Sequence, residues 1–383
     1  MTASVEIVFF LSIFVIVYVY AGYPAAVFIL GATRNRGVNK APFEPFVTVL
    51  IAAYNEKDGI ADTVSNKLAQ EYPAARMEIL VVSDGSTDGT DEIVRGFSDP
   101  RVKPLRQIPR AGKTSALNMA VPKTRGEIIV FSDANSIYAP DAIRKLVSNF
   151  SDPEVGYVTG SMVYANPDGS PIGHGCTMYM KYENVLRAAE TRVGSIVGVD
   201  GGIDAVRRKL YQPMDADQLP DFILPLKVVE QGYRVVYEPE AVLREPSLND
   251  AEDEYKMRVR VSLRSLWALS AMRRLLGPGI SPVFAWQLWS HKVLRYLCFI
   301  FLVSALLSNL MLLGTGLFYQ FTFLCQGVCY AAALSAPALR QNRAASSLVA
   351  IPRYFFLLNL ASAHAFAKFL MGKKQVLWTP RKG

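Results

Sequence analysis

Two oxygen-bearing side chains, Asp133 and Asn135, directly follow an apolar, β-branched run over residues 126–130. Such a run predicts a buried strand, and the carboxyl end of a parallel strand faces the crevice where open α/β sheets bind ligands. Residues two apart on an extended chain share one face. Asp133 and Asn135 can therefore hold a hard divalent cation, Mg²⁺ or Mn²⁺, together with oxygens from a diphosphate. A polar turn after the strand is the alternative interpretation.

Two earlier strands are predicted to end at the same edge. The run over residues 46–53 is followed by Tyr54 and Glu56, and the run over residues 78–82 ends near Asp84. Because open α/β sheets bind ligands outside the carboxyl ends of their strands, these polar groups should face one crevice. Asp84 is placed to accept a hydrogen bond from a nucleobase, and a plain turn that caps the next helix is the alternative.

Lys113 stands where a loop over residues 110–112 enters a predicted helix. The first N–H groups of a helix are unpaired and its N-terminus carries partial positive charge, so a lysine at this position can meet a phosphate. The segment is not a P-loop, because the upstream glycines are missing. The alternation of strands and helices predicts an α/β domain with a mostly parallel sheet and a nucleotide crevice.

Four motifs together resemble one enzyme family. The segments over residues 51–56, 83–90, 112–118 and 132–135 occur in the order and spacing of family 2 glycosyltransferases. The resemblance covers residues 45–270 and extends to bacterial exopolysaccharide, hyaluronan, chitin and cellulose synthases. It implies an inverting transferase with a GT-A fold that uses a nucleotide sugar, and a UDP-sugar is the expected donor.

The resemblance also implies which residues form the donor site. These are Ala53, Tyr54, Glu56, Asp84, Lys113, Asp133, Arg258 and Arg260. It assigns the metal to Asp133 and Asn135. The family often has a second acid where this chain has Asn135, whose oxygen is neutral. A cation bound there meets one fewer negative charge, so metal affinity should be weaker without being lost.

Asp221 is the predicted catalytic base. The family usually has two adjacent acids at this point, the second being the base, and this chain has Pro220 and Asp221. A carboxylate opposite the diphosphate can take a proton from the acceptor hydroxyl, and a single displacement then inverts the anomeric centre. A helix-capping role for Asp221 is the alternative. For the acceptor, Gly201 allows close approach of the backbone to a sugar, and Asp200 either bonds sugar hydroxyls or forms a turn.

Residues 252–276 show the pattern of a long amphipathic helix in the membrane interface. Arg258 and Arg260 align with the central positions of the family's Gln-Arg-x-Arg-Trp motif and would brace the diphosphate. Binding to lipid headgroups is the alternative for both, and it is the favoured interpretation for Arg264. The outer Gln and Trp of the motif are absent, which counts against a processive synthase.

The composition is divided between soluble and membrane-like segments. The 383 residues are 51% hydrophobic with a net charge of +8, and the apolar residues gather in the ranges 5–30 and 293–371. Basic residues cluster at the borders of these runs, which favours anionic membrane lipids over nucleic acid as partners. The expected organisation is a transmembrane anchor (1–33), a cytoplasmic GT-A domain (34–250), amphipathic interface helices (251–290) and C-terminal membrane segments with a basic tail (291–383).

Basic residues after the first apolar run place the domain in the cytoplasm, so a multi-pass protein of the inner membrane is expected. The runs over residues 294–313 and 317–337 are long enough to cross a bilayer. The run over residues 347–371 carries charges that cost about 2.5–3.5 kcal/mol each at mid-bilayer, so an in-plane helix with a cytoplasmic tail is expected. A further helix over residues 176–192 is predicted to carry its charges on polar faces.

The function that these features favour is transfer of a sugar, with inversion, to a membrane-associated acceptor, either lipid-linked or a polysaccharide. Such an enzyme would serve envelope or exopolysaccharide synthesis, with other envelope-biosynthesis proteins as possible partners. A processive synthase that threads polymer through its helices is one alternative. A non-catalytic nucleotide-sugar-binding scaffold is the other, and the presence of Asp221 argues against it.

Overall fold

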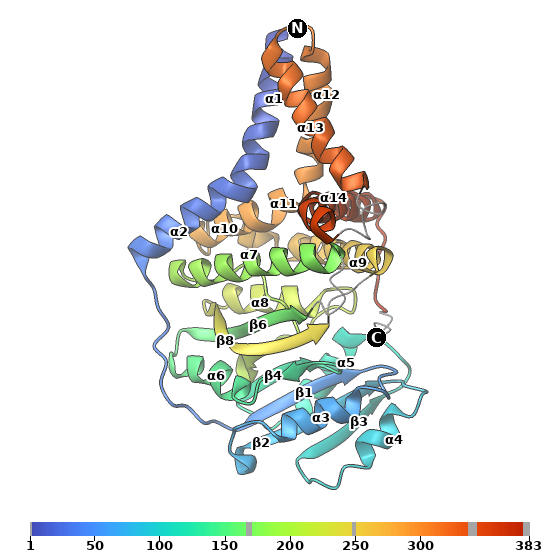
Figure 1. The fold of residues 1–383 in the computed structure, drawn as a ribbon. Coiled ribbons are helices and arrows are strands. Elements are labelled where there is room, and N and C mark those ends of the chain that lie inside the picture. Colours follow the sequence, from blue (N-terminus) through green and yellow to red (C-terminus); the bar gives the residue numbers. More distant parts are fainter. Residues whose placement is uncertain (1, 166–170, 247–249, 336–342, 378–383) are drawn as a thin grey trace.

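The structure is a computed structural model that describes residues 2–165, 171–246, 250–335 and 343–377. Its elements are stacked in layers (Figure 1). A sheet with its flanking helices lies at one end, a layer of helices lies across it, and slender apolar helices extend to the opposite end. The chain passes between these layers several times, so residues far apart in sequence meet between the sheet and the helix layer.

The described residues form an eight-stranded sheet in the order β3-β2-β1-β4-β7-β6-β8-β5. Four pairings are parallel and three are antiparallel. The predicted parallel sheet is therefore confirmed for β3-β2-β1-β4, whereas the whole sheet is mixed. The strands are β1 (Val47–Ala53), β2 (Met77–Asp84), β3 (Val102–Gln107), β4 (Ile128–Asp133), β5 (Ile137–Tyr138), β6 (Val155–Ala165), β7 (Ile203–Arg207) and β8 (Arg234–Pro246).

Helices cover both faces of the sheet, which explains the continuous apolar runs of its central strands. Every residue of β1 and β2 is buried. One face packs against α3 (Ile60–Leu68), α4 (Thr90–Arg95) and α6 (Ala142–Ser148), and the other against α5 (Lys113–Ala120) and α8 (Pro220–Glu230). The parallel register sets Ala53 beside Ser83 and Ala52 beside Asp133, so the three strand tips reach one edge together.

The helix layer consists of α7 (Pro171–Val193), α9 (Ala251–Ala271), α10 (Pro282–Leu288), α11 (Leu294–Tyr296) and α14 (Arg343–Leu370). The long amphipathic helix expected over residues 252–276 is present as α9, and 3-10 turns follow it. Part of its apolar face packs on α14, where Val259 and Leu263 meet Ala361 and Ala365. This face is therefore covered by protein.

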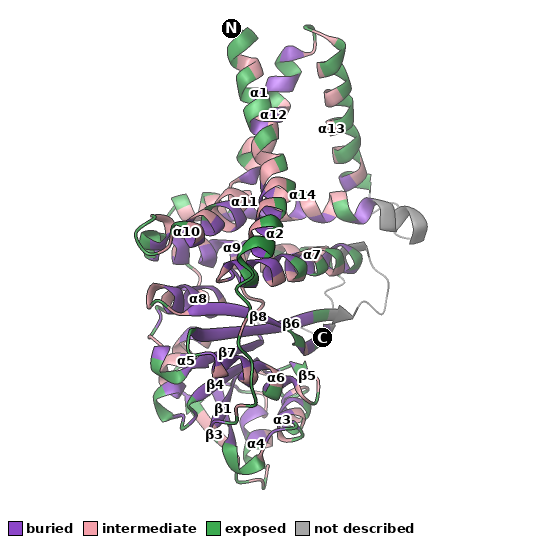
Figure 2. Ribbon diagram, turned by 90° about the vertical axis from the view of Figure 1, so that its left-hand side faces the viewer, coloured by how far each residue is buried: buried purple, intermediate pink, exposed green. Residues whose placement is uncertain are grey.

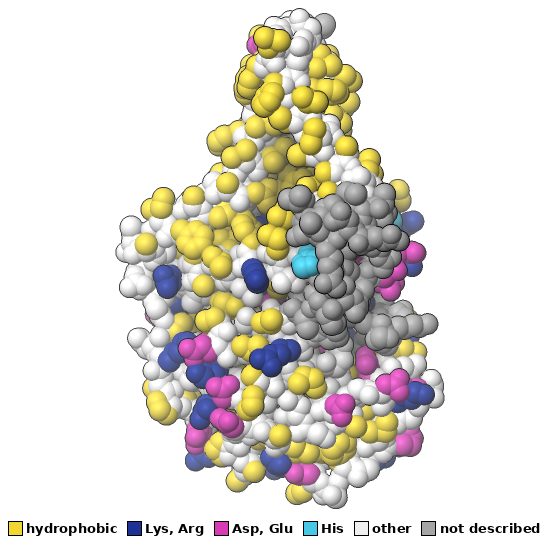
Figure 3. Space-filling view, viewed as in Figure 1, with side chains coloured by type: hydrophobic (Ala, Val, Ile, Leu, Met, Phe, Trp, Pro, Cys, Tyr) yellow, Lys and Arg dark blue, Asp and Glu magenta, His cyan; other side chains and the backbone are white. Residues whose placement is uncertain are grey.

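Apolar helices extend beyond the layer. The N-terminal helical segment Thr2–Arg34, which contains α1 (Thr2–Val17) and α2 (Tyr23–Arg34), is long and apolar enough to cross a membrane, as is α13 (Leu317–Ser335). The stretch Pro282–Tyr296 with α12 (Cys298–Leu312) is bent by 58° and would be a third span. Hydrophobic side chains cover this end of the molecule, whereas charged ones are spread over the sheet domain (Figure 3).

The helix α14 lies across the helix layer (Figure 2) and is not among the candidate spans in the described residues. The tail that follows it returns to the sheet domain. There Lys374 forms an ion pair with Asp217 at 2.7 Å, and the carbonyl of Val376 lies against Gly112. These contacts support the in-plane helix expected over residues 347–371, with its tail on the side of the sheet domain.

This arrangement predicts the sidedness of two positions in a cysteine-free background. A cysteine at Met371, which is 68% exposed at the end of α14, should react with a membrane-impermeant thiol reagent from the same side as a cysteine at the exposed Lys256 on α9. Labelling of intact cells and of inverted vesicles would measure this. Reaction of the two positions from opposite sides would show that α14 crosses the membrane.

Candidate functional site

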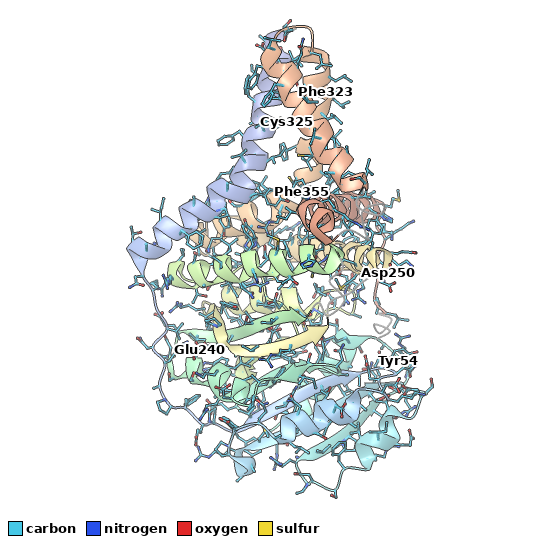
Figure 4. All side chains as sticks on the ribbon, viewed as in Figure 1. Tyr54, Glu240, Asp250, Phe323, Cys325 and Phe355 are labelled. Atoms are coloured by element: carbon cyan, nitrogen blue, oxygen red, sulfur yellow. The ribbon has the colours of Figure 1, made fainter. Side chains whose placement is uncertain are left out.

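A cavity of about 610 Å³ opens between the sheet edge and the helix layer. Figure 4 shows two positions on either side of this region, with Tyr54 at the edge of the sheet and Phe355 in the helix layer. Most of the residues predicted from sequence line this cavity. They are Glu56, Lys113, Asp133, Asn135, Asp200, Asp221, Arg258 and Arg260.

Lys113 links the predicted metal ligand to the predicted base. Its Nζ lies 2.6 Å from Oδ1 of Asp133 and 3.6 Å from Oδ1 of Asp221. It is the first residue of α5, and Gly112 before it has a φ of +95° that favours glycine. Although burial by itself lowers the pKa of Lys113, the two carboxylates raise it above its ordinary value. The lysine therefore stays charged between them.

Asp221 lies in the first turn of α8 and faces the cavity. Leu219 is the N-cap of this helix and Pro220 its first residue, which is a favourable place for proline. Gly201 approaches the carboxylate so closely that a Cβ there would lie 2.7 Å from Oδ2 of Asp221, and its φ is +76°. The predicted acceptor segment therefore lies directly against the predicted base. Acceptor contacts by Gly201 and Asp200 stay predictions.

The position of Asp84 differs from the expectation. Its side chain is fully buried and does not line the cavity. Its oxygens accept hydrogen bonds from the side chain of Gln107 (2.6 Å) and from the backbone N–H groups of Ala111 (2.8 Å) and Gly112 (2.9 Å). In this conformation the carboxylate organises the loop before α5. Contact of Asp84 with a nucleobase stays a prediction.

Sequence reasoning missed the part played by Arg110. Its guanidinium lies 3.4 Å from the centre of the Tyr54 ring, a cation–π contact. Tyr54 follows directly after Ala53, the last residue of β1, so this pair stands at the strand tips where the nucleotide is predicted. A stacked planar pair of this kind offers a surface to a nucleobase. The signal in the sequence was a basic residue two positions before Gly112, in the loop that leads to Lys113.

Glu56 adds negative charge at the Asp133 end of the cavity. Burial, followed by the charges of Asp133 and Asp88, raises the pKa of Glu56 to about 7. A cation at this end would relieve the repulsion between the carboxylates. Among the described residues, no three His, Cys, Asp or Glu side chains converge as a metal site. Asp133 and Asn135 still fit a Mg²⁺-type ion, which is usually held by one or two carboxylates together with substrate phosphates.

The three arginines of α9 differ in their surroundings. Arg258 pairs with Glu254 at 2.7 Å and donates to the Tyr354 hydroxyl of α14 at 2.6 Å, while it also lines the cavity with Arg260. Contact of these two with a diphosphate stays a prediction. The headgroup role favoured for Arg264 is wrong, because its side chain is buried. It donates to Thr114 Oγ1 (3.0 Å) and to backbone carbonyls that precede α8.

The helix predicted over residues 176–192 is present within α7, and Arg192 is exposed as expected, but the other three charges predicted on its polar faces are not solvated. Glu183, Arg187 and Glu190 are all buried. Arg187 pairs with Asp200 and donates to the carbonyl of Gly198 at 3.1 Å, which holds the segment that leads to Gly201. Glu183 and Glu190 are seven residues apart and therefore share a helix face, a signal that could have indicated a common partner.

Asp204 on β7 lies beneath the site. It is fully buried, and neither carboxyl oxygen has a hydrogen-bond partner among the described residues. Burial, followed by the charge of Asp221, raises the pKa of Asp204 well above its ordinary value. The protonated, neutral form of Asp204 is therefore favoured, so Asp204 places no second negative charge close to Asp221.

Comparisons with known proteins agree with this geometry. Residues 48–214 match Glycosyl transferase family 2. The chain contains a family 2 glycosyltransferase domain. The structure is similar over 96% of this chain to a mannosyltransferase from Pyrobaculum calidifontis, solved in complex with GDP-Man and Mn²⁺, with a TM-score of 0.74 and 24% identity. That similarity, over 99% of the other chain, establishes the GT-A fold that the motifs implied.

The chain has relatives named as a polysaccharide synthase and as an N-acetylglucosaminyltransferase. The chain is 28% identical over 270 residues to a poly-beta-1,6-N-acetyl-D-glucosamine synthase of Staphylococcus aureus, covering 66% of this chain and 64% of the synthase. It is 27% identical over 345 residues to an N-acetylglucosaminyltransferase of Rhizobium meliloti, covering 84% of this chain and 79% of the relative. The match therefore spans less than two thirds of the length of the staphylococcal synthase.

The buried acid beneath the site predicts a change in pH dependence. An acid whose pKa is raised on folding contributes stability at low pH, and this contribution is lost as the pH rises from its unfolded value towards its folded one. The Tm of the wild type should therefore fall relative to that of Asp204→Asn as the pH rises above about 4, the ordinary pKa of an aspartate. Thermal unfolding of the full chain in detergent measures this, with the exposed Asp62→Asn as control. If the difference in Tm between the wild type and Asp204→Asn does not change with pH, Asp204 is not a buried neutral acid.

Proposed function

We propose that the protein transfers a sugar, with inversion, from a nucleotide sugar to a membrane-associated acceptor, with Asp221 as general base. The observation that carries the proposal is the arrangement of Asp133, Lys113 and Asp221 along one wall of the cavity. A donor diphosphate at Asp133 would meet Lys113, and an acceptor hydroxyl at Asp221 would lie on the opposite side of the reacting carbon. This is the order that a single inverting displacement requires.

In this reaction Asp221 takes the proton of the acceptor hydroxyl as its oxygen bonds to the anomeric carbon, and the bond from that carbon to the diphosphate breaks. Lys113 balances the negative charge of the leaving diphosphate. A divalent cation bound at Asp133 and Asn135 would supply further charge for the same purpose. The side chain of Lys113 is only 19% exposed, so water screens its charge less than it would screen a charge on the surface.

A UDP-sugar is the proposed donor, and the relatives suggest which ones to test first. Both relatives are named for N-acetylglucosamine, so UDP-N-acetylglucosamine comes first. GDP-mannose comes second, because the structural neighbour holds GDP-Man. The acceptor is proposed to be lipid-linked or a polysaccharide of the cell envelope, and the domain is proposed to face the cytoplasm from the inner membrane.

A processive synthase is the second candidate, favoured by the staphylococcal relative's name and by a cavity that continues from Asp221 into the helix layer. Product length distinguishes the two candidates. Purified protein that makes a ladder of long polymer is processive, whereas single or few additions support the first candidate.

Removal of the proposed base should stop transfer without affecting the donor. Asp221→Asn should lower the turnover of acceptor glycosylation by about 10²–10⁴-fold, the usual contribution of general base catalysis. Binding of UDP should stay close to that of the wild type. The exposed Asp62→Asn is the matched control. Turnover at the wild-type level in Asp221→Asn would refute the assignment.

Because Asn135 supplies a neutral amide oxygen, we expect a low metal affinity that one substitution can raise. Asn135→Asp adds the missing negative charge, so transfer should reach half its maximum at a lower Mn²⁺ or Mg²⁺ concentration, whereas Asp133→Asn should need a higher one. Titration of metal into chelator-treated protein, with transfer and UDP-sugar binding as readouts, measures both. Identical metal curves for all three proteins would place the metal elsewhere.

A further inference from the structure

The cavity does not end at the proposed base. Beyond Asp221 it continues into the helix layer, where its lining changes character. Two cations, Lys292 and Arg295, stand between the polar end with Asp133 and an end formed by side chains of the apolar helices and of α14. They come from the π-helical turn Trp289–Val293 and from α11, both within the first part of the bent candidate span.

Lys292 has no acidic partner in the described part of the chain. No carboxylate lies within ion-pair distance of its Nζ, whereas Arg187 pairs with Asp200 and Arg295 with Glu183. The amine occupies the space that a side chain at position 198 would need, since a Cβ on Gly198 would lie 2.3 Å from it. Glu183 and Glu190 act on the amine only from beyond ion-pair distance, and a partly desolvated cation without a direct ion pair is costly. An anionic ligand in the cavity would remove that cost.

Arg295 strengthens the case for an anion. Its side chain is only 11% exposed and lies against the rings of Tyr20 and Tyr182, each at 5.5 Å. Its Nε is buried without a hydrogen-bond partner among the described residues. A largely buried guanidinium at the wall of a cavity adds positive charge that favours a phosphate or carboxylate there.

The position of these cations points to the acceptor. Lys292 lies 5.8 Å from the ring of Phe222, the residue that follows Asp221. The loop that contains Gly198 also contains Asp200 and Gly201, the predicted acceptor residues. The anion site is therefore on the acceptor side of the base, away from the diphosphate site at Asp133.

The far end of the cavity suits a hydrocarbon chain. It is lined by Met178 and Tyr182 of α7, by Phe355 and Leu358 of α14, and by Tyr20 of the N-terminal apolar segment. Figure 4 shows Phe355 in the helix layer, next to the apolar helices. A ligand that fills the whole space would combine a sugar at Asp221, an anion at Lys292 and an apolar chain towards the membrane.

We propose that Lys292, together with Arg295, binds the phosphate of a lipid-linked acceptor whose hydrocarbon chain leaves between α7 and α14. This inference deepens the proposed function and rests on it for the identity of the reacting sugar. The site itself can be tested without any transfer reaction, so the two proposals can fail separately.

The test measures binding of farnesyl phosphate and of farnesol to the full-length protein in detergent. Farnesyl phosphate should bind at least about 10-fold more tightly, the value of one charge-assisted hydrogen bond. Lys292→Met should abolish this preference and Lys292→Arg should retain it. The matched control is Lys181→Met, which removes an exposed lysine of α7 that does not line the cavity. Equal binding of both probes, or a preference that survives in Lys292→Met, would overturn the proposal.

A second variant tests whether Lys292→Met acts only by misfolding the protein. A third ligand tests whether the site binds a carboxylate instead of a phosphate. Gly198→Ala leaves every charge in place but crowds the amine, so it should also weaken farnesyl phosphate binding while UDP binding is kept. Free glucuronate serves as the carboxylate probe. If glucuronate binding depends on Lys292 and farnesyl phosphate binding does not, an acidic sugar is the ligand and the lipid phosphate assignment is wrong. If the wild-type protein binds farnesyl phosphate but transfers no sugar from a UDP-sugar, the proposed function is wrong and the phosphate site is not affected.

Discussion

The contact on which the site depends is the one between Lys113 and two carboxylates from distant parts of the chain. Asp133 ends the strand β4, whereas Asp221 lies in the first turn of the helix α8, almost ninety residues later. The lysine at the start of α5 lies within 4 Å of both. The positive charge of the lysine therefore offsets the negative charges that a metal ligand and a base bring to one cavity.

Much of the surrounding structure holds these three side chains in place. The carboxylate of Asp84 binds the N–H groups of Ala111 and Gly112 and so positions the start of α5. Arg264 reaches from α9 to the backbone before α8 and to Thr114, which joins the two helices that carry Lys113 and Asp221. Each of these charged groups is buried and satisfied by backbone partners, which is the condition under which a buried charge is tolerated.

The helix layer connects the site to the apolar segments through buried charges. His291 lies between Glu183 at 3.1 Å and Glu190 at 2.7 Å, and Tyr23 of α2 donates to Glu190. Burial alone would raise the pKa of Glu183, but Arg295 and His291 lower it well below its ordinary value. The N-terminal apolar segment is therefore joined by hydrogen bonds to α7, which in turn holds the acceptor loop through Arg187. A shift of one layer would disturb all of these contacts.

The sequence by itself determined the strand tips and the residues on them. The central parallel strands are recognisable because burial on both faces demands continuous apolar runs, and Lys113, Asp133 and Asp221 were predicted from local motifs. It also located the apolar helices, because a span needs a long apolar run. Short motifs carry this information, since it depends only on neighbouring residues.

Only the tertiary structure decided which charges are buried and what they contact. The patterns around Glu183, Arg187 and Arg264 are those of a solvated or membrane-facing helix, and their partners lie as far away as position 295 or before α8. The same holds for Asp84, whose local pattern suits a ligand contact but whose oxygens are taken by the loop that packs over it. Pairing over such distances follows from how the layers stack, and no local spacing in the chain specifies it.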